Sequence, residues 1–260
     1  MGDLAGDSVY DVFGNEFPLL IKFIDAHDKL SVQVHPDDDL AFSRHGGQGK
    51  TEMWYVLEAG ENSQLINGFN RKLTPEEYQK SCLEGKLTEI LNFIPAKKED
   101  VFFIPSGRVH AIGEGIMLAE IQQASDITYR IYDFDRKDSS GKPRELHTEQ
   151  ALEAIDYDFH EDYRTKYTPK MNQTVNAVNC KYFVTNVFRF NMPIEKDYPE
   201  IDSFVVYLCT EGKCKIEYDD ERNFITLEKG ETVLIPAMIK NLCFYPEKET
   251  NLLEVYLDIK

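Results

Sequence analysis

Long apolar runs are missing from this chain of 260 residues. The longest, such as residues 17–24, fall far short of the ~20 residues that cross a bilayer as a helix, so no membrane span is predicted. Basic residues are scarce as well: 29 Lys and Arg stand against 46 Asp and Glu, a formal net charge of −17. This balance argues against binding nucleic acid or an anionic membrane over a broad surface. An anionic substrate would need a local cluster of Lys and Arg.

Cysteines are few and unpatterned. The chain has five, an odd number, and contains no C-x-x-C pair. Most lie in apolar surroundings, which favours buried free thiols in a reducing compartment. The chain begins Met-Gly-Asp-Leu-Ala-Gly-Asp and has no basic start followed by an apolar stretch, so no secretory signal is predicted. We expect a cytoplasmic location.

Short runs rich in Val, Ile, Phe and Tyr, bounded by Gly, Pro and Asp, predict a mainly β protein. A helical insertion is expected at about 74–92, because Thr74 followed by proline and two acids is a helix start. Residues 1–136 then form a first domain, polar residues 137–170 a linker with a short helix, and residues 171–260 a second domain. The strands expected in the first domain are 19–24, 30–34, 52–57, 101–104, 117–122 and 128–132.

An internal repeat links the two predicted domains. Residues 100–105, Asp-Val-Phe-Phe-Ile-Pro, match residues 231–236, Glu-Thr-Val-Leu-Ile-Pro. Residues 54–60 resemble residues 206–212 in the same order. The sequence therefore predicts two copies of one β-barrel.

The strand Leu-Ser-Val-Gln-Val-His places Gln33 and His35 two residues apart, so both side chains lie on one face. Glu52 follows Gly-Lys-Thr at the start of another expected strand. An imidazole, an amide oxygen and a carboxylate are ligands for a divalent metal ion such as Zn²⁺, Fe²⁺, Mn²⁺ or Co²⁺.

A further histidine belongs to Pro105-Ser-Gly-Arg-Val-His110, of the form P-x-G-x-x-H. This form resembles the second signature of the cupin β-barrel, in which the histidine binds metal. In the second copy, Asn241 occupies the place of His110, and Phe204 stands about where Glu52 does. We therefore expect the metal site in the first barrel alone, held by Gln33, His35, Glu52 and His110.

Four segments together resemble the type I mannose-6-phosphate isomerases, especially their shorter bacterial branch. They are Leu-Ser-Val-Gln-Val-His-Pro-Asp-Asp at 30–38, Gly-Lys-Thr-Glu-Met-Trp-Tyr at 49–55, Phe-Ile-Pro-Ser-Gly-Arg-Val-His-Ala-Ile at 103–112, and Gln-Gln-Ala-Ser-Asp-Ile-Thr-Tyr-Arg-Ile-Tyr-Asp at 122–133. The resemblance implies two cupin-like (jelly-roll) barrels and one Zn²⁺ per chain. It also implies interconversion of mannose 6-phosphate and fructose 6-phosphate through a cis-enediol, with the active-site arginine at Arg130.

Four residues are catalytic candidates. Arg130 keeps its proton and so suits stabilisation of negative charge, unless it forms a structural ion pair with Asp126 or Asp133. Lys50, two residues before Glu52, could transfer a proton or hold phosphate. Lys22 is an unusual residue within an apolar run, and Glu120 is a weaker candidate base.

The chain departs from the resembled family at its start, because the family has strands before the part that matches Phe17 onward. Their absence predicts an open sheet edge, so we expect a monomer or a homodimer paired through that edge. Two other functions fit the residues. One is an iron-dependent cupin oxygenase, since two histidines and a carboxylate also form a facial triad. The other is a non-catalytic module that binds a sugar phosphate.

Overall fold

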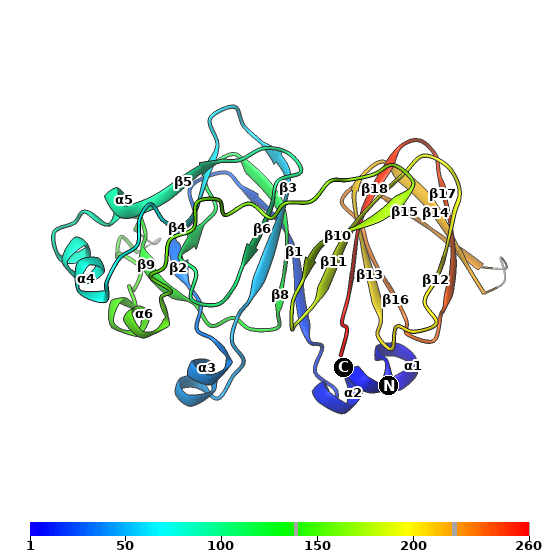
Figure 1. Ribbon diagram of the computed structural model, residues 1–260, viewed down its shortest axis with the longest axis horizontal. Helices are drawn as coiled ribbons and strands as arrows, with labels where there is room; N and C mark the ends of the chain where they lie inside the picture. Colours follow the sequence, from blue (N-terminus) through cyan, green and yellow to red (C-terminus); the bar gives the residue numbers. More distant parts are fainter. Residues whose placement is uncertain (138–139, 220–222, 260) are drawn as a thin grey trace. The chain divides into compact units, whose positions relative to one another are not determined.

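The computed structural model describes residues 1–137, 140–219 and 223–259 (Figure 1). The chain forms two compact units. We call Pro18–Thr165 the first barrel, and Met1–Phe17 together with Lys166–Lys260 the second barrel. Each consists mainly of antiparallel strands arranged in two sheets, which confirms the predicted mainly β fold with two cupin-like barrels. The bounds of the units differ from the predicted domains, because residues 1–17 join the second unit and residues 137–165 the first.

In the first barrel, one sheet has the strand order β1-β8-β3-β6 and the other β5-β4-β7-β2-β9. The edge strand β1 pairs with β8 alone among the described strands, so the expected pairing of a second copy at an open edge stays a prediction. The strands are β1 (Leu19–Ala26), β2 (Val32–Val34), β3 (Glu52–Ala59), β4 (Gln64–Phe69), β5 (Leu91–Pro95), β6 (Val101–Ile104), β7 (His110–Ala111), β8 (Ile116–Gln123) and β9 (Tyr129–Tyr132).

Successive side chains along these strands point alternately to the outer and the inner face of each sheet. On the sheet that contains β2, the side chains of Val32 and Val34 pack into an apolar cluster on the outer face, together with residues of three helices. Gln33 between them therefore points to the opposite, inner face. A second apolar cluster, which includes Trp54 and Leu118 from the other sheet, fills part of the inside.

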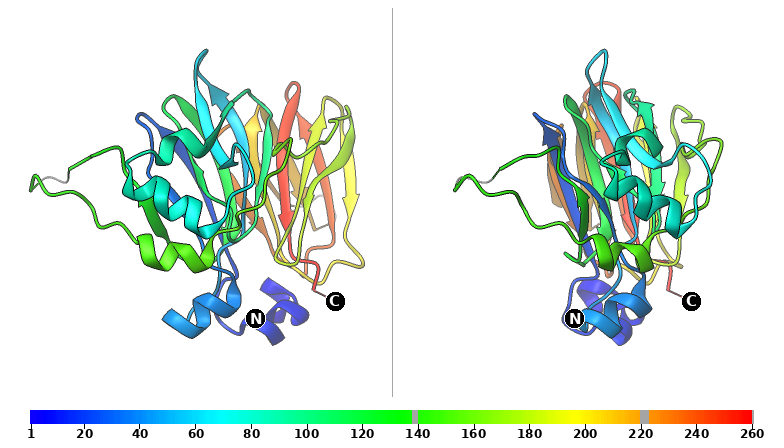
Figure 2. Two further views of the ribbon diagram at one scale, coloured as in Figure 1. Left: turned by 60° about the vertical axis from the view of Figure 1, so that its left-hand side comes forward. Right: turned by 90° about the vertical axis from the view of Figure 1, so that its left-hand side faces the viewer.

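Helices α4, α5 and α6 gather on one side of the first barrel in Figure 2. The predicted insertion at 74–92 is present as α4 and α5, and Thr74 forms a capping box with Glu77. β5 begins at Leu91, so the helical part of the insertion ends just before the predicted bound of about 92. The predicted linker helix is α6. The helices of this unit are α3 (Asp38–His45), α4 (Pro75–Leu83), α5 (Leu87–Ile90) and α6 (Thr148–Ala154).

The second barrel has one sheet of order β10-β11-β18-β13-β16 and another of order β12-β17-β14-β15. Its interior is an apolar cluster that includes Phe188, Ile216 and Phe244. The strands are β10 (Gln173–Asn179), β11 (Val184–Phe190), β12 (Ile194–Asp197), β13 (Val205–Glu211), β14 (Lys213–Tyr218), β15 (Asn223–Glu228), β16 (Thr232–Ile235), β17 (Asn241–Pro246) and β18 (Thr250–Tyr256).

The internal repeat is real, but its register differs by one residue from the predicted alignment. Glu52 pairs with Ile104, and in the second barrel Val205 pairs with Ile235. The counterpart of Glu52 is therefore the apolar Val205. The predicted counterpart, Phe204, instead packs against Phe17, with the two rings tilted and their centroids 4.7 Å apart.

Asn241, which the repeat aligned with His110, has different surroundings from that histidine. It is exposed, and its amide lies next to Asp197, whereas His110 is fully buried. The inside of the second barrel also holds an ion pair between the buried Glu254 and Lys196, whose side chain is 12% exposed. Glu254 also accepts a hydrogen bond of 2.9 Å from the Tyr207 hydroxyl, so these polar groups satisfy one another.

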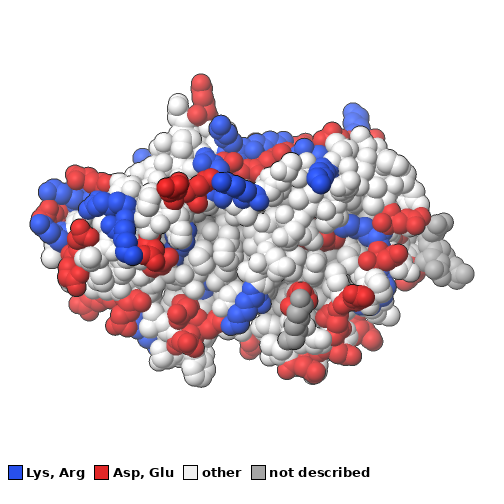
Figure 3. All heavy atoms as spheres, in the orientation of Figure 1, with Lys and Arg blue, Asp and Glu red and all other residues white. Residues whose placement is uncertain are grey.

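The surface carries mixed charges. On the face shown in Figure 3, Lys and Arg side chains are interspersed with Asp and Glu, in keeping with the acidic composition. No helix in the described part of the chain has the length and apolar character needed to cross a membrane.

Two helices, α1 (Gly2–Ala5) and α2 (Asp7–Phe13), attach the start of the chain to the second barrel. The backbone N–H of Phe204 donates to the Ala5 carbonyl. The Asp202 carboxylate accepts from the backbone N–H groups of Asp7 and Ser8, at 3.0 and 2.8 Å, and from the Ser8 hydroxyl. These bonds hold the first turn of α2 and explain why residues 1–17 belong to the second unit.

Replacing Asp202 by alanine should release this segment. The loss of three hydrogen bonds to a helix start should lower the free energy of unfolding by ~1 kcal/mol, as loss of a helix cap does. Hydrogen exchange of the amides of residues 7–13 should accelerate, whereas D11A, which changes an exposed residue of the same helix, should leave it unchanged. Equal exchange rates in the two variants would contradict this account.

Candidate metal and catalytic site

His35, Glu52 and His110 form a buried cluster inside the first barrel. Their potential ligand atoms all lie within 4.8 Å of one another. Nε2 of His35 is 3.5 Å from Oε2 of Glu52, and Nε2 of His110 is 3.3 Å from Oε1. The three side chains are at most 1% exposed. In the described part of the chain, this is the one group of three His, Cys, Asp or Glu residues with such spacing.

Both sheets contribute to the cluster. Glu52 begins β3, while Gln33 in β2 and His110 in β7 are direct cross-strand partners on the facing sheet. His35 follows β2. The P-x-G-x-x-H turn fixes the approach to His110: Gly107 has φ of +85°, and its N–H donates to the His35 carbonyl over 2.8 Å. A side chain at Gly107 would be strained in this conformation and would lie 3.0 Å from the Ala154 carbonyl oxygen.

The orientation of both imidazoles fixes their tautomers. Nδ1 of His35 lies 2.9 Å from the Ile127 carbonyl oxygen, and Nδ1 of His110 lies 2.8 Å from that of Arg108. A carbonyl oxygen only accepts, so each Nδ1 carries the hydrogen and each neutral ring directs the lone pair of Nε2 toward Glu52. Burial lowers the pKa of His35 to about 4 and also lowers that of His110, which keeps both rings neutral near pH 7.

Two lone pairs thus face a buried carboxylate. Among the described residues, neither oxygen of Glu52 has a partner with regular hydrogen-bond geometry, although Oε2 forms an ion pair with Lys50. Burial alone would raise the pKa of Glu52, but the neighbouring imidazoles and the positive charge of the Lys50 ammonium hold it well below its ordinary value. An arrangement of acceptors directed at one another, in which the carboxylate stays ionised, is the donor set of a divalent metal ion.

Gln33 and Lys50 complete the surroundings of the cluster. Nε2 of Gln33 lies 3.2 Å from Nε2 of His110. As a donor it satisfies that lone pair, so only its Oε1, after the amide turns, could ligate a metal. Nζ of Lys50 lies 2.8 Å from Oε2 of Glu52 and 3.1 Å from Nε2 of His35. The structure thus brings together the four predicted ligands and Lys50.

Lys22 in β1 and Glu120 in β8 form a second polar group on the inner face of the sheet that contains β3. Nζ of Lys22 donates to Oε1 of Glu120 over 2.8 Å and to Oε1 of Gln122 over 2.6 Å. Gln122 is the cross-strand partner of Glu52, so this group borders the cluster. The Lys22 side chain is 37% exposed, whereas that of Glu120 is 4% exposed.

Trp54 joins the two groups, and the sequence analysis did not select it. Its indole N–H donates to Oε2 of Glu120 over 3.0 Å, and its ring packs edge-on against His110 with centroids 5.3 Å apart. Its position two residues after Glu52, on the same face of β3, was the available signal.

Arg130 lies on the inner face of the sheet that carries Gln33. It is the cross-strand partner of Gln33, and its neighbours Tyr129 and Ile131 pack into the outer cluster. Nη1 donates to the Glu145 carbonyl over 3.0 Å, and Nε is buried without a hydrogen-bond partner among the described residues. Burial and the nearby positive charge of Arg144 lower the pKa of Arg130.

The alternative of a structural ion pair for Arg130 does not match the described contacts. Asp133 pairs with Arg136 and Arg144 instead, and no described carboxylate lies within ion-pair distance of the Arg130 guanidinium. His147, which had no predicted role, accepts a hydrogen bond from the Arg130 backbone N–H through Nδ1.

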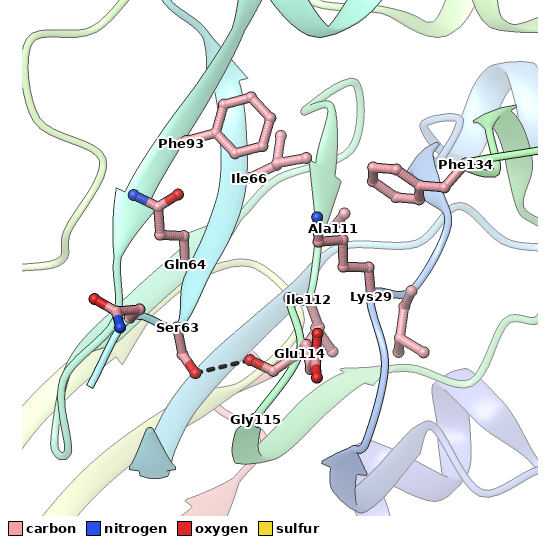
Figure 4. Close-up of a pocket in the computed structure, with 13 residues that line it drawn as sticks. Lys29, Ser63, Gln64, Ile66, Phe93, Ala111, Ile112, Glu114, Gly115 and Phe134 are labelled. Carbon is pink, nitrogen blue, oxygen red and sulfur yellow. Dashed lines mark hydrogen bonds between the residues drawn. The ribbon is translucent and has the colours of Figure 1, made fainter. Parts of the chain in front are cut away.

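The first barrel also has a hollow of about 370 Å³ that is separate from the metal and catalytic candidates. Figure 4 shows Phe93 and Phe134 on two sides of it, with Ile66 and Ala111 between them. Ile66 and Ala111 belong to the outer apolar cluster. Since Ala111 follows His110 in β7, the two side chains point to opposite faces of the sheet. The hollow therefore does not open onto the cluster of His35, Glu52 and His110.

Comparison with known proteins finds one consistent set of relatives. Residues 2–80 match the family model described as phosphomannose isomerase type I, catalytic domain. Mannose-6-phosphate isomerase of Streptococcus mutans is 36% identical over 239 residues, which cover 90% of this chain and 74% of that protein. Mannose-6-phosphate isomerase ManA of Bacillus subtilis is 37% identical over 229 residues, covering 86% of this chain and 70% of that protein.

Solved structures agree. The crystal structure of the mannose 6-phosphate isomerase from Bacillus subtilis matches with a TM-score of 0.84 and 31% identity, covering 93% of this chain and 76% of that chain. A mutant phosphomannose isomerase from Salmonella typhimurium, at 15% identity and a TM-score of 0.79, shares the fold. Sequence and structure together therefore place this chain in the type I phosphomannose isomerase family.

Proposed function

We propose that this chain interconverts mannose 6-phosphate and fructose 6-phosphate, using one Zn²⁺ ion held in the first barrel by Gln33, His35, Glu52 and His110. The names of its relatives support the substrate pair. One observation carries the metal site: two imidazole lone pairs face an ionised, fully buried carboxylate that has no hydrogen bond of regular geometry and pairs with Lys50. Five free cysteines fit a reducing, cytoplasmic location.

The donor set fits a divalent ion of intermediate hardness. Two imidazole nitrogens, one carboxylate oxygen and one amide oxygen suit Zn²⁺, and also Fe²⁺, Mn²⁺ or Co²⁺. When bound, such an ion would supply positive charge to the substrate oxygens that become negative during the reaction. The backbone carbonyls on both Nδ1 atoms would keep the imidazoles in the ligating tautomer.

Aldose–ketose isomerisation needs a base and a positive charge at the developing oxyanion. A base removes the proton from C2 of the open-chain aldose, the carbonyl electrons move onto O1, and O1 takes up a proton to give a cis-enediol. The O2 hydroxyl then loses its proton as C2 becomes the ketone carbon, and the base returns the first proton to C1. Arg130 suits the charged role, because its guanidinium is partly buried, permanently cationic and lacks a described carboxylate partner. It would bind the enediolate oxygens or the phosphate.

Three residues are candidates for moving the proton. Lys50 lies within 3.1 Å of two ligand side chains and would act near the reacting oxygens. Lys22 and Glu120 are hydrogen-bonded to each other, so a proton passed between them would stay within the pair. Both oxygens of Glu120 are occupied, by Lys22 and by Trp54, which favours a lysine as the group that touches substrate. A base in position contributes ~10²- to 10⁴-fold to the rate.

Metal removal should abolish turnover. Protein treated with a chelator should lose isomerase activity, and added Zn²⁺ should restore it together with about one ion per chain, measured by a coupled assay and by elemental analysis. E52Q should weaken Zn²⁺ binding by at least the ~10- to 100-fold that loss of an outer ligand partner causes. H27A changes an exposed histidine and should bind normally.

Other results would favour the other functions. Iron in the purified protein with consumption of oxygen would support an oxygenase. Binding of fructose 6-phosphate with no isomerisation by the Zn²⁺-loaded protein would support a non-catalytic module. Either result would overturn the proposed activity.

Replacing Arg130 by alanine should lower kcat by ~10²- to 10³-fold, the usual effect of removing one donor to an oxyanion. The Zn²⁺ content should not change, because Arg130 contacts none of the proposed ligand atoms among the described interactions. R71A removes an exposed arginine and serves as the control. Normal turnover by R130A would remove Arg130 from the mechanism.

A further inference from the structure

Asp133, three residues after Arg130, forms ion pairs with two other arginines and not with Arg130. The carboxylate is 6% exposed and accepts from Nε of Arg144 over 2.7 Å and from Nε of Arg136 over 3.1 Å. The Nη2 groups of both arginines also bind Oδ1. Hydrogen bonds from Arg144 and Arg136 hold the pKa of Asp133 below its ordinary value. Asp133 thus stays ionised and fixes both guanidinium groups.

Arg144 connects this carboxylate to Arg130 through its own backbone. The next residue, Glu145, offers the carbonyl oxygen that accepts from Nη1 of Arg130. Two residues further, the His147 N–H donates to the Arg130 carbonyl over 2.7 Å, and Nδ1 of His147 accepts from the Arg130 N–H over 3.1 Å. Residues 144–147 therefore run alongside β9 and contact Arg130 at three points.

These contacts determine where the Arg130 guanidinium points. The bond to Glu145 is the hydrogen bond that the described structure provides for the Arg130 guanidinium, so the position of that carbonyl sets the direction of the group. Asp133 anchors Arg144, and Arg144 anchors Glu145. The two other arginines also occupy the carboxylate, which would otherwise be a competing partner for Arg130, only three residues away.

We propose that Asp133, paired with Arg136 and Arg144, is a positioning residue that directs the Arg130 guanidinium toward the substrate anion. This inference rests on the role assigned to Arg130 in the proposed function. Asp133 has no described interaction with the proposed metal ligands; it acts through Arg144 and the Glu145 carbonyl. A displacement of ~1 Å of a group that stabilises a transition state costs up to ~100-fold in rate, so a modest shift of this carbonyl has a measurable effect.

A double-mutant cycle tests the proposal on the full, Zn²⁺-loaded chain. D133N keeps the size of the side chain but loses its charge. It should lower kcat by ~10- to 100-fold with little change in KM, and D133E should recover part of the loss. In an R130K background, D133N should have little further effect, because the group that it positions is already changed. D158N, which breaks an exposed ion pair with Lys72, is the control.

A structural role alone gives a different result. If D133N only destabilises the fold, it lowers activity by the same factor in both backgrounds, and that outcome would overturn the proposal. R144K is the second variant in case D133N folds poorly, since lysine keeps the charge and one of the hydrogen bonds. Thermal unfolding of each variant identifies the folded ones.

A readout independent of activity separates this inference from the proposed function. The Nε–H signal of Arg130 in a ¹⁵N NMR spectrum, assigned by its loss in R130K, should shift or broaden in D133N and stay unchanged in D158N. An unchanged signal would overturn the positioning role even in an active isomerase. A changed signal in a protein without isomerase activity would support the positioning role and count against the proposed function alone.

Discussion

The site depends on one electrostatic constraint: an ionised carboxylate, with Lys50 as its neighbouring cation, faces two imidazole lone pairs in a buried space. Carbonyl oxygens behind His35 and His110 impose this arrangement by fixing where each ring carries its hydrogen. Burial then keeps the rings neutral. Repulsion between such groups is tolerated in a folded protein when a cation lies among them. The two-sheet architecture serves this constraint, because it brings Glu52 from one sheet to His110 on the other.

Local sequence patterns were sufficient to predict much of the fold and the cluster of His35, Glu52 and His110. Alternating runs predicted strands, Thr74 predicted the start of α4, and the spacing of Gln33 and His35 predicted a shared face. Helix α3 was missed, although Asp37 caps it and Gly46 ends it in the left-handed conformation. What escaped prediction depends on tertiary contacts: Trp54 bridging Glu120 and His110, and the partners of Arg130, which lie in a segment about 15 residues further along the chain.

The one-residue difference in the repeat shows the limit of pattern matching. A shift of one residue along a strand exchanges its two faces, so the alignment assigned Phe204 to the inner position that Val205 occupies. Only the pairing of β13 with β16 settles this register. The second barrel keeps a buried glutamate, Glu254, whose cross-strand partner is Tyr207, just as Trp54 is the partner of Glu120 in the first barrel. Lys196 and two tyrosines bind that glutamate, so the second copy uses its polar interior for packing.

The contacts of Lys50 have a consequence for how the site is loaded. Its ammonium lies between an imidazole nitrogen and the carboxylate, and so acts as a built-in counter-ion of Glu52. A divalent ion held by the proposed ligands would compete with this ammonium for the same imidazole nitrogen and carboxylate oxygen. Under the proposed function, binding of the ion and release of the Lys50 amine would therefore be linked, so the amine would become available to the substrate when the ion is bound.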